Sequence, residues 1–136
     1  MSATRGRERV RAWVPVLAYM VVIVALSSVR IDAPSIARLP FKDKLVHFVE
    51  YAGLGLLTMR ASSRTWPGHP PLRLAAFAVL LTSAFGLSDE LHQAFVPGRT
   101  ADARDLLADV LGAMLGVALW LAPSALRRRS LRTRRS

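Results

Sequence analysis

Apolar residues gather in four long runs along the chain, and most polar residues lie between these runs. Each run approaches the ~20 residues with which an α-helix crosses the hydrocarbon core of a membrane. The pattern predicts an all-α fold, an integral membrane four-helix bundle. We expect a membrane domain at residues 12–122, with spans at about residues 12–29, 45–59, 72–88 and 106–122, between basic tails at residues 1–11 and 123–136.

The first run follows the basic stretch "RGRERVR" and could be read as a signal peptide. It is longer than a usual signal core and no clear small-x-small cleavage site follows it, so we expect a retained span. Pro15 lies near its expected start, where a helix has amides without an intrahelical partner and tolerates proline.

Lysine and arginine are distributed unequally between the two sides of this topology. The two tails and the middle loop hold thirteen of them, whereas the other two loops hold six. Because cytoplasmic flanks are enriched in positive residues, we expect both termini to be cytoplasmic. Every acidic residue except Glu8 then lies toward the outer side. The densest basic cluster, "RRRSLRTRR", directly follows an apolar run, which favours a disordered tail beside membrane lipid and no nucleic-acid partner.

Polar residues on the second run fall at helical spacing. Lys44, His47 and Tyr51 are spaced i, i+3, i+7, and Asp43, His47 and Glu50 are spaced i, i+4, i+7. Residues at these spacings share one side of a helix. The second run therefore has a polar stripe that we expect to face the other helices.

The fourth run begins with a similar stripe. Asp102, Asp105 and Asp109 are spaced i, i+3, i+7, after a "PGR" turn, and either Thr100 or Asp102 suits the N-cap of a helix. Asp109, like Glu50, lies ~10 Å deeper than the first acid of its stripe. A carboxylate facing lipid at that depth costs ~2–3 kcal/mol. We expect both acids to point into the bundle, near His47, Tyr51 or Arg99.

Small residues predict where helices approach closely. Gly112 and Gly116 form a small-xxx-small pair on the fourth run, and Gly53 and Gly55 lie on the second. Such pairs let two helix backbones come together in a membrane. We interpret these glycines as packing positions.

The stretches "DKLVHFVEYAGLG" and "SDELHQAFVPGRTADARDLLADVLGAMLG" resemble the VanZ-like family of small bacterial membrane proteins. The likeness covers about residues 43–116, and the matching positions are Asp43, Lys44, His47, Tyr51, Asp89, Glu90, Gln93, Pro97, Arg99, Asp105 and Gly112. Family members often have Asn at the position of Asp109. The resemblance implies a multi-pass protein of the bacterial plasma membrane. The family is named for a protein associated with resistance to teicoplanin, and no established reaction comes with the name.

Three functional hypotheses follow. In the first, an outward-facing polar pocket recognises a polar or lipid-linked component of the cell envelope, with a link to the glycopeptide response. Its ligand-binding residues would be Lys44, His47, Tyr51, Asp89, Glu90, Gln93, Arg99 and Asp105. In the second, the protein is a hydrolase or transferase acting on a lipid headgroup, with catalytic candidates His47, Glu50, Asp89 and Glu90.

The second hypothesis includes a metal-assisted form, although the sequence requires no cofactor. The candidate nitrogen and oxygen ligands for a divalent metal are His47, Glu50, Asp89, His92 and Asp109, together with Glu90 and Asp105. In the third hypothesis, the protein is a structural or assembly partner, and the charges only lock the helices in register.

Overall fold

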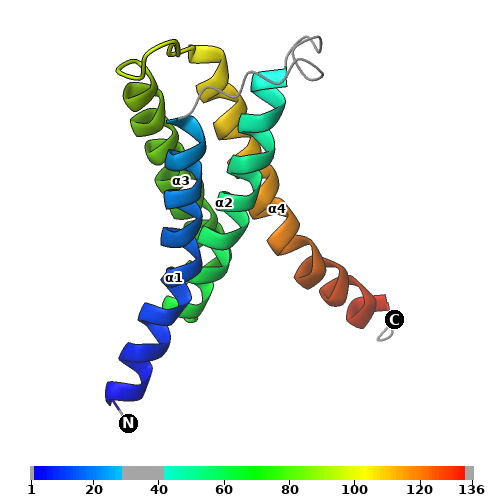
Figure 1. The fold of residues 1–136 in the computed structure, drawn as a ribbon. Coiled ribbons are helices and arrows are strands. Elements are labelled where there is room, and N and C mark those ends of the chain that lie inside the picture. The colour runs from blue at the N-terminus through cyan, green and yellow to red at the C-terminus, as the bar shows by residue number, and fades with distance from the viewer. Residues whose placement is uncertain (1, 29–41, 134–136) are drawn as a thin grey trace.

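The computed structural model describes residues 2–28 and 42–133, and these residues form four helices joined in up-and-down order (Figure 1). The helices are α1 (Ser2–Ser27), α2 (Lys42–Thr65), α3 (Pro71–Gln93) and α4 (Ala103–Thr133). The predicted all-α bundle is confirmed. The expected first outer loop, which includes Arg30 and Arg38, lies outside the described residues.

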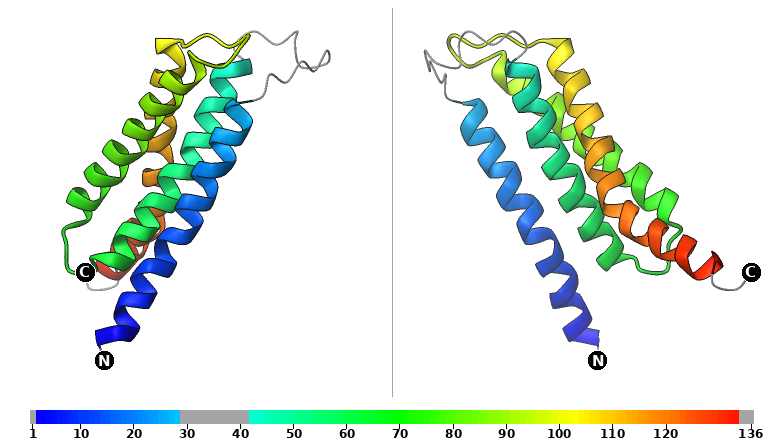
Figure 2. Two further views of the ribbon diagram at one scale, coloured as in Figure 1. Left: turned by 60° about the vertical axis from the view of Figure 1, so that its left-hand side comes forward. Right: turned by 90° about the vertical axis from the view of Figure 1, so that its right-hand side faces the viewer.

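One end of the bundle holds the ends of α1 and α3 and the starts of α2 and α4 (Figures 1 and 2). The start of α1 and the end of α4 lie at the opposite end. The α2 helix has the most extensive packing, chiefly against α4 and also against α1 and α3, so it is the central element of the bundle. Side chains on its various faces can therefore meet residues from the whole chain.

Three helical segments of the described chain are long and apolar enough to cross a membrane, namely Gly6–Ser27, Pro71–Gln93 and Ala103–Ala122. Their outer faces carry exposed large apolar side chains, such as Val21, Leu80 and Leu119. Such faces suit lipid. The α2 helix is as long as these segments, but it is less apolar because acids and bases lie along it. Its central position buries much of its polar surface against protein.

All four helices extend beyond the expected spans, and α1 and α4 also include most of the terminal tails. The α1 helix begins at Ser2, so Pro15 lies inside it and not in its first turn. Proline has no amide hydrogen, so α1 lacks the hydrogen bond that this position would donate to the preceding turn. At the other terminus, α4 continues to Thr133, so most of the tail expected to be disordered is helical. Alanine, leucine and arginine, which are common in that segment, are good helix formers.

The α2 and α4 backbones approach closely at Gly112 and Gly116. A Cβ atom at Gly112 would collide with the carbonyl oxygen of Phe48, and one at Gly116 with that of Ala52. The predicted small-residue seam is therefore present, and α2 supplies its other side. On the α2 side of the seam, Gly55 packs against the α4 backbone at Ala113.

An aromatic cluster joins the helices toward the opposite end of the bundle. Trp13 and Trp66 each meet Phe77 edge to face, and they also contact each other. The indole Nε1 of Trp13 donates a hydrogen bond to the Thr65 hydroxyl at 2.9 Å. Through this cluster, α1 is held against the end of α2 and the first half of α3.

The seam predicts a specific sensitivity to side-chain size. We expect Gly116→Ala to lower the free energy of unfolding by about 1–3 kcal/mol, because the added methyl group forces the two backbones apart. Gly6→Ala is the matched control, since it adds a methyl group to α1 where no atom lies within 4 Å. Unfolding of the purified protein in detergent, followed by circular dichroism, compares the two. Equal stability of both variants would contradict this packing.

Candidate functional site

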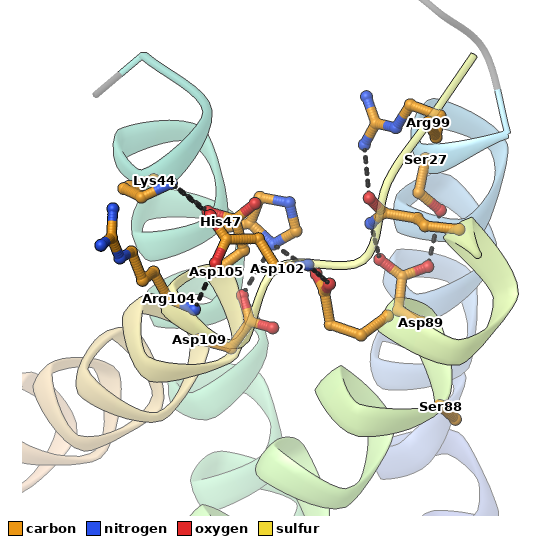
Figure 3. A network of polar contacts seen from close by, with 12 residues as sticks. Ser27, Lys44, His47, Ser88, Asp89, Arg99, Asp102, Arg104, Asp105 and Asp109 are labelled. Carbon is orange, nitrogen blue, oxygen red and sulfur yellow. Dashed lines mark hydrogen bonds and ion pairs between the residues drawn. The ribbon is translucent and has the colours of Figure 1, made fainter. Parts of the chain in front are cut away.

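Buried and half-buried polar side chains gather where α3 ends and α4 begins (Figure 3). They form three neighbouring groups. The His47 cluster is His47, Glu90 and Asp109; the Lys44 bridge is Lys44, Asp102 and Asp105; the Asp89 chain is Ser27, Asp89, Gln93 and Arg99.

The His47 cluster joins α2, α3 and α4 inside the bundle. His47 Nδ1 lies 2.9 Å from Asp109 Oδ1 and 3.9 Å from Glu90 Oε1. Asp109 is fully buried, and the side chains of His47 and Glu90 are each 6% exposed. When Asp109 is ionised, Nδ1 must carry the proton of the short contact, because a carboxylate can only accept.

Several oxygen atoms at this cluster lack a hydrogen-bond partner within the described part of the chain. They are Glu90 Oε1, Asp109 Oδ2 and the hydroxyl oxygen of Tyr51, and all three are buried. Leaving a buried polar atom unpaired costs about 1–3 kcal/mol, and more for a charged group. The cluster therefore has unused capacity to bind a proton or a cation.

Tyr51 and Gly86 form the inner boundary of the cluster. The Tyr51 ring is nearly parallel to the imidazole of His47, with 6.3 Å between ring centroids. A Cβ atom at Gly86 would lie 2.8 Å from Asp109 Oδ2 and 3.1 Å from Tyr51 Cε1. The missing side chain at Gly86 thus leaves the space that Asp109 and Tyr51 share.

The Lys44 bridge covers the start of α4. Lys44 Nζ donates to Asp102 Oδ2 and to Asp105 Oδ1, each at 3.0 Å. Asp102 also caps α4, because its Oδ1 accepts from the Arg104 amide at 2.9 Å. This observation selects Asp102 over Thr100 as the helix cap. The preceding turn contains Gly98 with φ 80°, in agreement with the turn expected at "PGR".

Asp102 is also connected to the His47 cluster. Its backbone amide donates to Glu90 Oε2 at 2.9 Å. This hydrogen bond links the end of α3 to the start of α4. It also leaves the second oxygen of Glu90 facing His47.

The pKa of Asp102 responds to these contacts. The Arg104 amide, followed by the Lys44 ammonium, holds the pKa of the Asp102 carboxyl below its ordinary value. Both partners bond the ionised form, which is why the pKa falls. The side chain is 39% exposed, so water screens part of the interaction.

The Asp89 chain runs from α1 to the α3–α4 turn. Asp89 Oδ1 accepts from the Ser27 hydroxyl at 2.6 Å, and Oδ2 accepts from the Gln93 amide at 3.0 Å. Gln93 Oε1 then accepts from Arg99 Nη2 at 2.9 Å. Asp89 and Glu90 are adjacent in sequence but belong to different groups, the Asp89 chain and the His47 cluster. The guanidinium of Arg99 has no carboxylate partner among the described residues.

Two predicted site residues lie outside these groups. Glu50 is half-buried and has no hydrogen bond or ion pair with them among the described residues, although it interacts electrostatically with His47 and Arg99, near which it was expected. Asp109 points inward as expected. His92 is exposed and its Nε2 contacts the Ser28 hydroxyl at 2.9 Å. Among the described residues, the only set that brings three candidate metal ligands together is His47, Glu90 and Asp109.

Sequence reasoning missed two contributors to the site. Ser27 lies within the first expected span, yet its hydroxyl donates a hydrogen bond to Asp89. The polar pair Ser27–Ser28 at the end of that span was the available signal. The second contributor is the Asp102 amide, which bonds Glu90. A backbone group leaves no trace in a sequence pattern, so no signal could have identified it.

The family model described as VanZ/LLP1 matches residues 3–126, which is most of the chain. This match confirms the resemblance drawn from the two motifs and extends it to α1. No curated protein and no solved structure matches the chain.

The lowered pKa predicts a pH-dependent contribution to stability. Because the folded pKa is the lower one, ionised Asp102 stabilises the fold above about pH 4, and this stabilisation is lost as the pH falls further. We expect Asp102→Asn, which keeps a capping side chain, to be less stable than wild type at pH 7. The difference should shrink at about pH 3. Lys44→Gln should reduce the pH dependence only in part, because the Arg104 amide remains. Thermal unfolding across this pH range measures both effects, and a pH-independent difference would contradict the assignment.

Proposed function

The chain belongs to the VanZ/LLP1 family of membrane proteins, and we propose that it recognises an anionic, lipid-linked component of the bacterial cell envelope. In this proposal it is a multi-pass protein of the plasma membrane with both termini in the cytoplasm. The end of the bundle that carries the three polar groups then faces outward. The ligand contributes a phosphate or carboxylate group.

The observation that carries this proposal is the position of Arg99. Arg99 is half-buried, and one nitrogen of its guanidinium donates a hydrogen bond to Gln93. A guanidinium has five N–H donors in a planar fork that matches phosphate and carboxylate oxygens. With no carboxylate partner among the described side chains, Arg99 keeps donors for an external anion.

The structure supports Lys44 less strongly as a direct ligand. Its ammonium already bonds two carboxylates, Asp102 and Asp105. An anion at Lys44 would compete with both. In the proposal, Lys44 holds the start of α4 in place, and Arg99 makes the cationic contact.

The outward orientation rests on the unequal distribution of basic residues. In the sequence, thirteen lysines and arginines belong to the two tails and the middle loop, and six belong to the other two loops. An outward site is compatible with the response for which the family is named, because teicoplanin acts at the outer face of the membrane. Lipid-linked wall components are exposed at the same face.

Arg99 provides the direct test of recognition. We expect wild-type protein in detergent to bind short-chain phosphatidic acid, and Arg99→Gln to weaken binding by about tenfold, since a charged hydrogen bond contributes about 1.5–3 kcal/mol. Arg104→Gln removes a nearby exposed charge and is the matched control. Isothermal titration calorimetry measures all three proteins, and titration with inorganic phosphate separates headgroup recognition from binding of the free anion.

The same variants distinguish recognition from a purely structural role. If the polar groups only stabilise the bundle, Arg99→Gln should unfold at lower temperature and accumulate poorly. If Arg99 contacts a ligand, the variant should fold normally and lose binding. Equal binding by Arg99→Gln and wild type would contradict the proposal.

Reporter fusions test the orientation separately. We expect a green fluorescent protein fused after Arg64 to fluoresce, because the α2–α3 loop is cytoplasmic in this topology. Alkaline phosphatase fused after Arg99 should be active, because it requires export. A fluorescent fusion after Arg99 would reverse the orientation.

A further inference from the structure

We propose that His47, Glu90 and Asp109 bind one divalent transition-metal ion inside the bundle, where α2, α3 and α4 meet. Zn²⁺ and Mn²⁺ are the ions whose chemistry fits. This inference does not depend on which envelope component the protein recognises, because Arg99 is not part of the cluster.

The spacing of the donor atoms suits a shared ion. One nitrogen and two carboxylate oxygens, one from each residue, lie within 4.8 Å of one another. The two distances from His47 Nδ1 are 2.9 Å to Asp109 Oδ1 and 3.9 Å to Glu90 Oε1. Zinc binds such atoms at about 2.0–2.2 Å, so neighbouring ligand atoms around one ion are separated by about 3–3.5 Å. Small side-chain movements bring the three atoms into this range.

Unpaired atoms provide an independent indication of a ligand. Glu90 Oε1 and Asp109 Oδ2 are buried with no hydrogen-bond partner among the described residues, and so is the hydroxyl of the adjacent, fully buried Tyr51. The contact between His47 and Asp109 leaves all three unpaired. A bound cation would supply both carboxylates with the partner that the protein does not.

Surrounding groups already hold the ligands in place. The Asp102 amide fixes Glu90 Oε2, which leaves Oε1 facing His47. The Tyr51 ring lies parallel to the imidazole, and Gly86 leaves room for the second oxygen of Asp109. Such supporting contacts orient metal ligands and strengthen binding.

The ligand types favour a particular class of ion. Two carboxylates offset the charge of a divalent cation and are oxygen ligands that suit Mn²⁺, and a neutral imidazole suits Zn²⁺. Ca²⁺ and Mg²⁺ prefer sites made only of oxygen atoms. We therefore expect Zn²⁺ and Mn²⁺ to bind more tightly than Mg²⁺ or Ca²⁺.

Calorimetry on the full chain in detergent tests the site. The protein for this experiment is prepared without a polyhistidine tag and with the substitutions His69→Gln and His92→Gln. These two histidines are exposed and could bind zinc at the surface. After treatment with a chelator and dialysis, it is titrated with Zn²⁺, Mn²⁺, Mg²⁺ and Ca²⁺. We expect one Zn²⁺ or Mn²⁺ per chain and a thermal midpoint that rises with ion concentration.

Three substitutions locate the ion. Glu90→Gln and Asp109→Asn preserve side-chain size, and each should weaken binding by at least about tenfold, because loss of even a supporting contact weakens metal binding about 10–100-fold. Glu8→Gln makes the same change at an exposed acid near the start of α1, at the opposite end of the bundle, and should alter binding by less than about twofold because charges that far apart are screened. Circular dichroism and gel filtration check that each variant folds. Two cluster variants are used so that the second still tests the site if the first does not fold.

The proposal is overturned if wild-type protein binds neither ion saturably, or if both cluster variants bind as wild type does. Equal weakening by Glu8→Gln would also overturn it, since it would indicate nonspecific attraction to acidic residues. Arg99→Gln should leave ion binding unchanged. Recognition at Arg99 and ion binding at His47 can therefore fail separately.

Discussion

The close approach of α2 and α4 is the constraint on which the rest of the structure depends. Gly112 and Gly116 bring the two backbones together because neither carries a side chain that would separate them. Asp109 lies one turn before Gly112 and thereby meets His47 of α2. The packing seam and the buried polar contact are two consequences of the same small residues.

The charges are organised by depth from the polar end of the bundle. Lys44 and Asp102 are partly exposed and satisfy each other, whereas His47, Glu90 and Asp109 lie deeper with unpaired oxygen atoms. A buried carboxylate requires compensation that water would otherwise supply. Burying the deeper group in a membrane protein therefore costs free energy. Such groups are characteristically functional.

Adjacent residues on α3 separate two kinds of chemistry. Asp89 connects to Ser27 of α1 and, through Gln93, to Arg99, which presents positive charge. Glu90 turns toward His47 and contributes negative charge to the interior. One helical turn can therefore support an anion-binding surface and a cation-binding interior. Membership in the VanZ/LLP1 family is established by the match over residues 3–126, and the roles of these two groups are our proposals.

The sequence by itself determined the helical fold, the family and the small-residue seam, because these depend on local composition and spacing. The i, i+3, i+7 pattern placed Lys44, His47 and Tyr51 together on α2, and depth placed Asp109 inside the bundle. Only the tertiary structure assigned partners. The fold connected Ser27 to Asp89, and it used a backbone amide to orient Glu90. Helical periodicity fixes which residues share a face, but the rotation and crossing of helices decide what that face meets.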